Sequence, residues 1–314
     1  MAQSLFITLK QLHPNCVIDV IAPTWSVPLL KRMPQVHAAI QLPISHKQLK
    51  LLTRYKLGKQ LRANRYDRAI VTPRSFKSAL VPFFAGARQR TGYRGEHRYF
   101  LLNDIRRLDK RVLTQTVQRY VALGYERDVT HVPQIPYPAL TVDRNNQQQV
   151  LKKLGLNSNK KIVAMMPGAE YGPAKQWPVT YYRELAQELV QRGYQVWVLG
   201  SARETKLGET IAANSDVINL CGRTELVDVV DLLALAEYAV SNDSGLMHVA
   251  AATGVKVIAI YGSSDPNYTP PLTDKATIIY KALDCSPCFK RVCPLGHTNC
   301  LNDISVQHVM ECVW

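Results

Sequence analysis

From residue 161 onward, short apolar runs alternate with segments whose apolar residues recur every three or four positions. Continuous apolar runs are typical of buried parallel strands, and the second spacing is typical of amphipathic helices. The strands expected on this basis are residues 161–168, 194–201, 217–222, 238–243 and 255–262. The helices expected between them are residues 178–193, 203–214, 225–236 and a helix that starts at Ser244. The alternation predicts a doubly wound parallel sheet.

The first half of the chain shows the same alternation less regularly. Strands are expected at residues 16–23 and 66–73, and helices at 46–66, 75–86 and 112–126. Pro133, Pro136 and Pro138 then favour an extended connection between two structural units. We therefore expect two α/β domains, over residues 1–138 and 139–314.

Charge separates the two halves of this 314-residue chain, whose net charge is +15. Residues 1–150 hold 24 Lys and Arg against 8 Asp and Glu, whereas the remainder holds 15 against 16. The basic half is expected to face a polyanion or an anionic membrane surface, unless it is an ordinary solvated face. No apolar run approaches the roughly 20 residues that span a bilayer, and the polar N-terminus does not resemble a secretory signal, so a cytoplasmic protein is expected.

The segment "SNDSGLMH" (241–248) joins an expected strand to an expected helix. The helix start offers free backbone N–H groups, and Gly245 lets a ligand approach the backbone closely. Together these features predict a phosphate site. Asp243 would repel a phosphate, and Lys175 from a neighbouring loop is the cation that would offset it. His248 lies one turn in, on the face of Ser244. The alternatives are a simple helix cap at Asp243 or Ser244 and a packed core histidine.

Other candidates carry weaker signals. Glu204 follows a strand, where nucleotide-binding folds place an acceptor for ribose hydroxyls. Ser75 is expected to cap a helix, which places Lys77 in the first turn of that helix. A cation there is unfavourable beside the positive end of the helix dipole, so Lys77 is expected to bind a ligand. Arginine forks and lysine charges suit phosphate and carboxylate groups. The cationic candidates of the first half are Arg74, Lys77, Arg90, Arg94 and Arg98.

A cysteine cluster lies in "DCSPCFKRVCPLGHTNC" (284–300), with His297 inside it. Its members are Cys285, Cys288, Cys293 and Cys300. The first pair has the C-x2-C spacing of zinc or redox sites, but the later spacings match no standard zinc finger. A loop of reduced or disulfide-linked thiols is the favoured alternative.

Five stretches together resemble the ADP-heptose:lipopolysaccharide heptosyltransferases of glycosyltransferase family nine. They are "RYDRAIVTPRSFKSALVPFFAG", "RTGYRGEHRYFLLND", "PGAEYGPAKQWP", "SNDSGLMHVAAATG" and "YGSSDPNYTPPL". The resemblance implies a GT-B architecture with two Rossmann-like domains. It implies inverting transfer of heptose from ADP-heptose, the second heptose onto the first, in the inner core of lipopolysaccharide. The partners would be ADP-heptose, that core and the inner membrane surface of a Gram-negative bacterium.

The resemblance also implies residue roles. Lys175 and Asp243 would act in catalysis, with Lys175 on the pyrophosphate. The implied donor-binding residues are Glu170, Tyr171, Lys175, Glu204, Asp243, Ser244, Gly245 and His248. The implied acceptor-binding residues are Arg74, Lys77, Arg94 and Arg98. Neither a metal ion nor another cofactor is expected, because protein groups can stabilise the departing ADP.

The N-terminus departs from the family pattern. "MAQSLFITLKQLHPN" has the apolar spacing of a helix, at Leu5, Phe6, Leu9 and Leu12, and "CVIDVIAP" follows as a strand. The family places a strand and a Gly-rich turn, with the presumed general-base Asp, before this helix. We therefore expect slow transfer by this chain, because a lost general base typically costs roughly 10²–10⁴-fold.

Three other functions compete with transfer. A nucleotide-sugar-binding protein without efficient catalysis would retain the same phosphate site. An NAD-dependent oxidoreductase is disfavoured because no G-x-G-x-x-G follows an expected strand. A nucleic-acid binder would explain the basic charge, but no nucleic-acid motif supports it.

Overall fold

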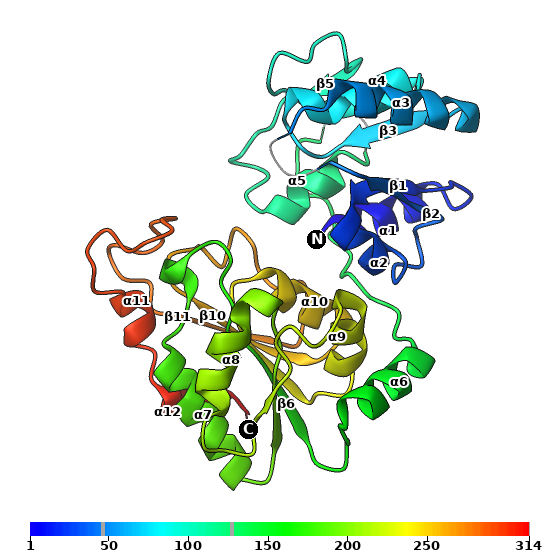
Figure 1. Cartoon of the computed structure of the whole chain (residues 1–314). Helices are drawn as coiled ribbons and strands as arrows, with labels where there is room; N and C mark the ends of the chain where they lie inside the picture. Colours follow the sequence, from blue (N-terminus) through cyan, green and yellow to red (C-terminus); the bar gives the residue numbers. More distant parts are fainter. Residues whose placement is uncertain (45–47, 126–128, 314) are drawn as a thin grey trace. The chain divides into compact units, whose positions relative to one another are not determined.

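The computed structural model describes residues 1–44, 48–125 and 129–313, and Figure 1 shows its chain path. The chain divides into two compact units. Unit 1 comprises Met1–Lys31 and Gln35–Pro136, and unit 2 comprises Arg32–Pro34 and Tyr137–Trp314. Among the described residues, no helix is both long and apolar enough to cross a bilayer.

Unit 2 is built on one six-stranded sheet with strand order β11-β10-β9-β6-β7-β8, in which every pair is parallel. The strands are β6 (Ile162–Met166), β7 (Gln195–Val198), β8 (Ile218–Asn219), β9 (Tyr238–Asn242), β10 (Lys256–Tyr261) and β11 (Ala276–Tyr280). The chain runs outward from β6 through β7 to β8 and then returns to the other side of β6 as β9. In open sheets of this kind, ligands bind beyond the carboxyl ends of the strands at such a reversal.

The helices of unit 2 connect and cover these strands (Figure 1). They are α6 (Arg144–Leu154), α7 (Val179–Gln191), α8 (Thr205–Ala212), α9 (Leu226–Leu233), α10 (Gly245–Thr253), α11 (Asn299–Asn302) and α12 (Val306–Met310). The expected helices at 178–193, 203–214, 225–236 and from Ser244 are confirmed as α7 to α10, with ends that differ by a few residues. The five strands expected in this half are confirmed as β6 to β10.

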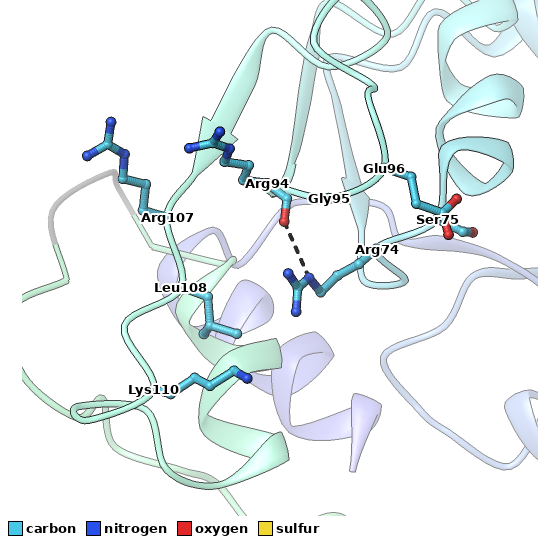
Figure 2. A pocket seen from close by; sticks show the side chains of 8 residues that line it. All are labelled: Arg74, Ser75, Arg94, Gly95, Glu96, Arg107, Leu108 and Lys110. Carbon is cyan, nitrogen blue, oxygen red and sulfur yellow. Dashed lines mark hydrogen bonds between the residues drawn. The ribbon is translucent and has the colours of Figure 1, made fainter.

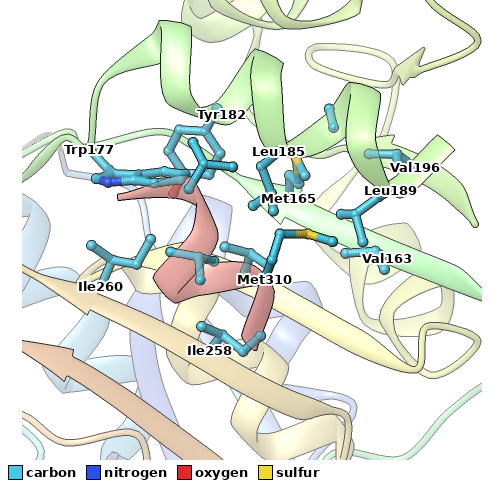
Figure 3. Close-up of a cluster of buried hydrophobic side chains, with 14 of the residues drawn as sticks. Val163, Met165, Trp177, Tyr182, Leu185, Leu189, Val196, Ile258, Ile260 and Met310 are labelled. Atoms are coloured by element: carbon cyan, nitrogen blue, oxygen red, sulfur yellow. The ribbon is translucent and has the colours of Figure 1, made fainter. Parts of the chain in front are cut away.

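The core of unit 2 lies between the sheet and helices α7 and α12 (Figure 3). Tyr182, Leu185, Ala186 and Leu189 follow the helical spacing of three or four residues, and all four are fully buried. Trp177 closes one end of this cluster, with its ring 4.9 Å from that of Tyr182. The apolar stripe of α7 therefore fixes the loop that ends at Trp177 on the sheet.

Unit 1 holds two parallel sheets, a pair β1-β2 and a triplet β3-β4-β5. Its strands are β1 (Asp19–Pro23), β2 (Ala38–Leu42), β3 (Arg68–Val71), β4 (Gln89–Tyr93) and β5 (Asp104–Arg106). Its helices are α1 (Ala2–Leu12), α2 (Val27–Leu30), α3 (Leu51–Leu61), α4 (Leu80–Phe84) and α5 (Thr116–Ala122). The expected N-terminal helix is confirmed as α1. Within the described residues of unit 1, no strand joins the two sheets.

A buried carboxylate ties the start of unit 2 to helix α9. Asp231 is 0% exposed, and its carboxylate accepts hydrogen bonds from Arg32 Nη2 at 2.6 Å, Asn146 Nδ2 at 2.8 Å and the backbone N–H of Asp143 at 2.8 Å. These bonds hold the segment that enters α6 against α9. Removing this carboxylate would leave the Asp143 N–H and Arg32 Nη2 without this acceptor, whereas Asn146 Nδ2 also donates to Asp228 at 3.0 Å.

Asp231→Ala should therefore destabilise unit 2 by on the order of 3 kcal/mol, since it leaves the guanidinium of Arg32 without its buried partner. Calorimetric unfolding should show a melting temperature lowered by several degrees. Asp216→Asn is the control, because Asp216 is exposed, and it should leave the transition unchanged. An Asp231→Ala transition at the wild-type temperature would show that this network does not hold the unit together.

Candidate functional site

Helix α10 begins beside the strand reversal in unit 2. Ser244 is its N-cap residue, and the Ser244 hydroxyl accepts from the backbone N–H of Met247 at 3.5 Å. Gly245 is exposed, and an added Cβ there would meet no heavy atom of the described structure within 4 Å. The first backbone N–H groups of the helix are therefore open to a ligand at the positive end of its dipole.

Lys175 and Asp243 form an ion pair at this helix start. Lys175 Nζ lies 2.5 Å from Asp243 Oδ2, and the two side chains are only 17% and 6% exposed. Lys175 ends a short 3-10 turn, Pro173–Lys175, in the loop after β6, and Asp243 directly follows β9. The loops after two neighbouring strands thus bring together the two residues that the sequence suggested as partners. The ammonium group offsets the carboxylate, so an anion can approach the N-terminus of α10.

Asn242 fixes both of these loops and was missed from the sequence. Its buried amide accepts from Trp177 N–H at 3.0 Å and from Tyr182 OH at 3.1 Å, and it donates to Pro167 O at 2.8 Å. One side chain therefore links the end of β9 to the start and end of the loop that carries Lys175. The only available signal was its place beside Asp243 in "SNDSG", which does not reveal these partners.

A C-terminal segment braces the Lys175 loop from the other side. Tyr171 OH donates to Phe289 O at 2.7 Å, and Ala174 N–H donates to Arg291 O at 3.1 Å. Arg291 also lies over the Tyr171 ring, 5.2 Å from its centroid, and Lys175 Nζ lies 5.0 Å from the same centroid. Gly172 has φ +154°, and a Cβ there would lie 2.4 Å from Arg291 O. The loop depends on this contact, which requires glycine.

Glu204 and Glu170 occupy different environments. Glu204 Oε2 accepts from Ser201 N–H at 2.5 Å, and a Cβ on Gly168 or Gly200 would collide with the Glu204 carboxylate. Glu204 therefore lies against the carboxyl ends of β6 and β7, on the same side of the sheet as the loop that carries Lys175. Glu170 is instead at the surface, 92% exposed and 3.8 Å from Arg203.

His248 lies one turn into α10. Its Nδ1 is buried and has no hydrogen-bond partner in the part of the chain that the structure describes. Burial lowers the pKa of His248 to about 4, although the nearby Asp243 carboxylate opposes that shift. The imidazole is therefore neutral at pH 7 and has an unused polar atom beside the ion pair.

The cysteine cluster surrounds a small cavity of about 20 Å³. Its walls include Cys285, Cys288, Cys293, Cys300 and His297, together with Ala174 and Ser263. All four thiols are free. Within residues 1–44, 48–125 and 129–313, no three His, Cys, Asp or Glu side chains are arranged to hold a metal ion. The segment 285–300 thus contributes to the site through its backbone, against the loop that carries Lys175.

Unit 1 contains a separate basic pocket of about 640 Å³ (Figure 2). Four cations line it, namely Arg74, Arg94, Arg107 and Lys110, with one carboxylate from Glu96. Arg74 Nε donates to Arg94 O at 3.3 Å, and Arg94 Nε donates to Tyr99 OH at 3.1 Å. Arg74 and Arg94 were expected from the sequence, whereas Arg107 and Lys110 were missed. Their position just after β5 could have suggested them, had that strand been recognised.

Three expectations for this region need correction. Arg98 is 2% exposed, and its guanidinium donates to the backbone carbonyls of Pro73, Ser75 and Tyr93, so Arg98 shapes the pocket and is not available to an acceptor. Ser75 makes no side-chain cap, and Glu96 accepts from Phe76 N–H instead. Lys77 does not line the pocket; its Nζ lies 3.5 Å from the carbonyl of Gln48.

Arg90 also serves the fold. Its guanidinium donates to Leu101 O and to Ala87 O, both at 2.7 Å, and it lies 5.6 Å from the centroid of the Phe83 ring.

The chain has two α/β units with parallel sheets, and an open helix N-terminus lies at the strand reversal of unit 2, where sheets of this kind bind ligands. The family model of glycosyltransferase family 9 (heptosyltransferase) matches residues 54–299. The chain therefore belongs to glycosyltransferase family 9.

Curated relatives match nearly the whole chain. The lipopolysaccharide heptosyltransferase 2 of Escherichia coli (strain K12) is 44% identical over 322 residues, covering 99% of this chain and 92% of that protein. The lipooligosaccharide heptosyltransferase 2 of Haemophilus influenzae Rd is 48% identical over 292 residues, covering 89% and 84%. The solved structure of the E. coli ADP-heptose lipopolysaccharide heptosyltransferase II matches with a TM-score of 0.86 at 43% identity, covering 99% and 92%.

Gly172→Ala should displace the Lys175 loop, because its Cβ would meet the backbone of Arg291 and the residue has a backbone conformation that favours glycine. We expect the affinity for ADP, measured by calorimetry, to fall about tenfold, which corresponds to roughly 1.4 kcal/mol.

Gly193→Ala is the matched control, since Gly193 has φ +87° and an added Cβ there meets no described heavy atom within 4 Å. It should cost stability without changing ADP affinity. Equal ADP affinities for the two variants would show that the contact with Arg291 does not position the site.

Proposed function

We propose that this chain transfers heptose from ADP-heptose to the inner core of lipopolysaccharide, adding the second heptose to the first with inversion. The observation that carries the proposal is the Lys175–Asp243 pair at the open N-terminus of α10. The curated relatives that match nearly the whole chain, named heptosyltransferase 2, support the choice of donor and acceptor.

The donor diphosphate is proposed to bind at the N-terminus of α10. The backbone N–H groups from Gly245 onward and the Ser244 hydroxyl would donate to its oxygens, with Lys175 supplying the charge. Glu204 would accept from the ribose hydroxyls, since it lies at the same sheet edge. Tyr171, Glu170 and His248 would complete the wall of this donor site.

The proposed reaction is a single displacement. The acceptor oxygen forms a bond to the anomeric carbon while the bond from that carbon to the diphosphate oxygen breaks. ADP leaves with the bonding electrons, and the acceptor hydroxyl passes its proton to solvent water. Negative charge grows on the diphosphate as the bond breaks, where Lys175 and the helix dipole stabilise it. Asp243 holds Lys175 in place.

The acceptor is proposed to bind in the basic pocket of unit 1. Arg74, Arg94, Arg107 and Lys110 bring four positive charges to one cavity, which suits the carboxylates and phosphates of an inner core. Because such an acceptor is anchored by lipid A, the protein would work at the cytoplasmic face of the inner membrane. This division gives each unit one substrate.

The direct test is transfer from ADP-heptose to two defined acceptors, a core that ends in the first heptose and a core that ends in Kdo. We expect a heptose-extended product, detected by mass spectrometry, only from the first acceptor. ADP-heptose binding without transfer to either would mean that the chain is a nucleotide-sugar-binding protein. Extension of the Kdo-terminated core would mean that it adds a different heptose.

Lys175→Ala should lower kcat/KM at least tenfold, because a charge-assisted contact to a departing phosphate is worth roughly 1.5–3 kcal/mol. The measurement is initial rate against ADP-heptose concentration. Lys161→Ala is the control, because Lys161 precedes β6 and so lies at the amino-terminal ends of the strands, away from the candidate site. This variant should retain the wild-type rate. A Lys175→Ala enzyme with unchanged ADP affinity and turnover would show that the donor site lies elsewhere.

Arg94→Glu and Arg107→Glu should each raise KM for the core acceptor at least tenfold and leave ADP affinity unchanged, because each reverses one charge in the pocket of unit 1. Steady-state kinetics with each substrate varied separates the two effects. Arg111→Glu, at a side chain that is 93% exposed and does not line the pocket, serves as the control. Reduced ADP binding with an unchanged acceptor KM would reverse the assignment of the two units.

A further inference from the structure

The outer face of helix α3 carries large apolar side chains that the described structure leaves uncovered. Leu52 is 65% exposed, Leu51 is 51%, Leu49 is 50% and Tyr55 is 40%. Leu51, Leu52 and Tyr55 lie in the first turns of α3 on one face of the helix, and Leu49 lies just before the helix begins. Single exposed leucines are ordinary, but three within four residues form a patch, which marks an interaction surface.

This patch is held rigidly in position. Arg54 is only 5% exposed, and its guanidinium donates to the carbonyls of Leu49 at 2.6 Å, Lys77 at 3.2 Å and Gln48 at 3.4 Å. Gly58 allows α3 to pack closely on α4, since a Cβ there would lie 2.5 Å from Phe84 Cβ. Figure 1 shows α3 beside α4 in unit 1. The N-terminal end of α3 is therefore tied to the rest of unit 1 through the hydrogen bonds of Arg54 and through packing on α4.

Aromatic side chains extend the patch onto α4. The Tyr55 and Phe84 rings meet edge to face at 5.0 Å, and Phe83, 36% exposed, lies 5.5 Å from Phe84. Tyrosine and phenylalanine at the margin of an apolar patch suit an interface between apolar and aqueous media.

Cations surround the patch without acidic neighbours along the chain. Lys50, Lys56, Lys59 and Arg62 are all exposed, and Lys59 Nζ lies 5.8 Å from the Tyr55 centroid. The sequence contains no Asp or Glu between Asp19 and Asp67. Exposed leucines whose charged neighbours along the chain are all positive are typical of helices that lie in the headgroup region of anionic bilayers, where lysine stems reach outward to the phosphates.

We propose that α3 and the residues before it dock unit 1 onto an anionic lipid bilayer. Leu49, Leu51 and Leu52 would enter the boundary between headgroups and acyl chains, and Lys56 and Lys59 would contact lipid phosphates. A nucleic acid would use the lysines but not the leucines, and the like charges of Lys50, Lys56 and Lys59 disfavour contact with a second copy of the same face. The proposal deepens the proposed function, because it gives the surface through which the enzyme reaches an acceptor anchored by lipid.

The patch is connected to the basic pocket within unit 1. Arg54 and Lys77 join the segment before α3 to the 3-10 turn Phe76–Ala79, which follows Arg74 and Ser75 of the pocket wall. Docking through α3 would therefore keep the pocket near the membrane surface, where the inner-core saccharide of a lipid-anchored acceptor lies.

Sedimentation with sucrose-loaded vesicles tests the proposal. The vesicles contain phosphatidylcholine with about 30–40% phosphatidylglycerol, so that both charge and apolar contact contribute to binding. The full chain should bind them at least tenfold more strongly than vesicles of pure phosphatidylcholine. Leu51→Ser with Leu52→Ser, and separately Lys56→Glu with Lys59→Glu, should each lower the anionic-vesicle partition coefficient at least tenfold.

Two matched controls come from unit 2. Val292→Ser with Leu295→Ser removes exposed apolar side chains of 66% and 61% exposure, and Lys152→Glu with Lys153→Glu reverses two exposed charges on α6. Both controls should bind vesicles as the wild type does. Circular dichroism and ADP affinity, expected to be unchanged in all four variants, verify folding.

Three outcomes would overturn the proposal. The first is wild-type vesicle binding by both α3 variants, and the second is equal binding of the chain to neutral and anionic vesicles. The third is a concentration-dependent dimer of the wild type that the α3 variants lose, which would make this face a self-association surface. Transfer to a water-soluble acceptor lacking acyl chains should stay at the wild-type rate in the α3 variants. That assay separates failure of the docking surface from failure of the proposed transferase function.

Discussion

The candidate donor site depends on one ion pair. Asp243 is nearly buried at the N-terminus of α10, where a carboxylate by itself would repel the anion that the helix dipole attracts. Lys175, 2.5 Å away, offsets this negative charge with a cation beside the start of α10. Because the two residues follow different strands, the pair exists only when β6 and β9 are neighbours. The reversal of strand order around β6 provides that arrangement.

The surrounding structure maintains this pair from both sides. Asn242 links the loop of Lys175 to the end of β9 through buried hydrogen bonds, and α7 anchors Trp177 through its apolar stripe. Phe289 and Arg291 hold the other side of the loop through Tyr171 and Ala174. The cysteine-rich segment thereby supports the loop of the candidate donor site through the backbone carbonyls of Phe289 and Arg291. In the proposed reaction, a site fixed by packed side chains in this way would be preorganised for the charge that develops on the diphosphate.

The sequence predicted unit 2 better than unit 1 for a physical reason. Strand β6 is buried on both faces and is a continuous apolar run, β10 is one after its first residue, and β9 begins with the apolar residues 238–240. Strand β4, "QRTGY", has no such run, and β5 is only three residues long, so neither was expected. Without β5, the roles of Arg107 and Lys110 could not be inferred. Arg98 was misassigned because a basic residue in a basic loop shows no sign of being buried against carbonyl groups.

The central claim is that the diphosphate of the donor binds between Lys175 and the N-terminus of α10. The most direct measurement is a crystal structure of the full chain with ADP. The account predicts diphosphate oxygens within hydrogen-bond distance of Lys175 Nζ, Ser244 Oγ and the backbone N–H groups at Gly245 and Leu246. A diphosphate bound at the basic pocket of unit 1, or away from both groups, would contradict it.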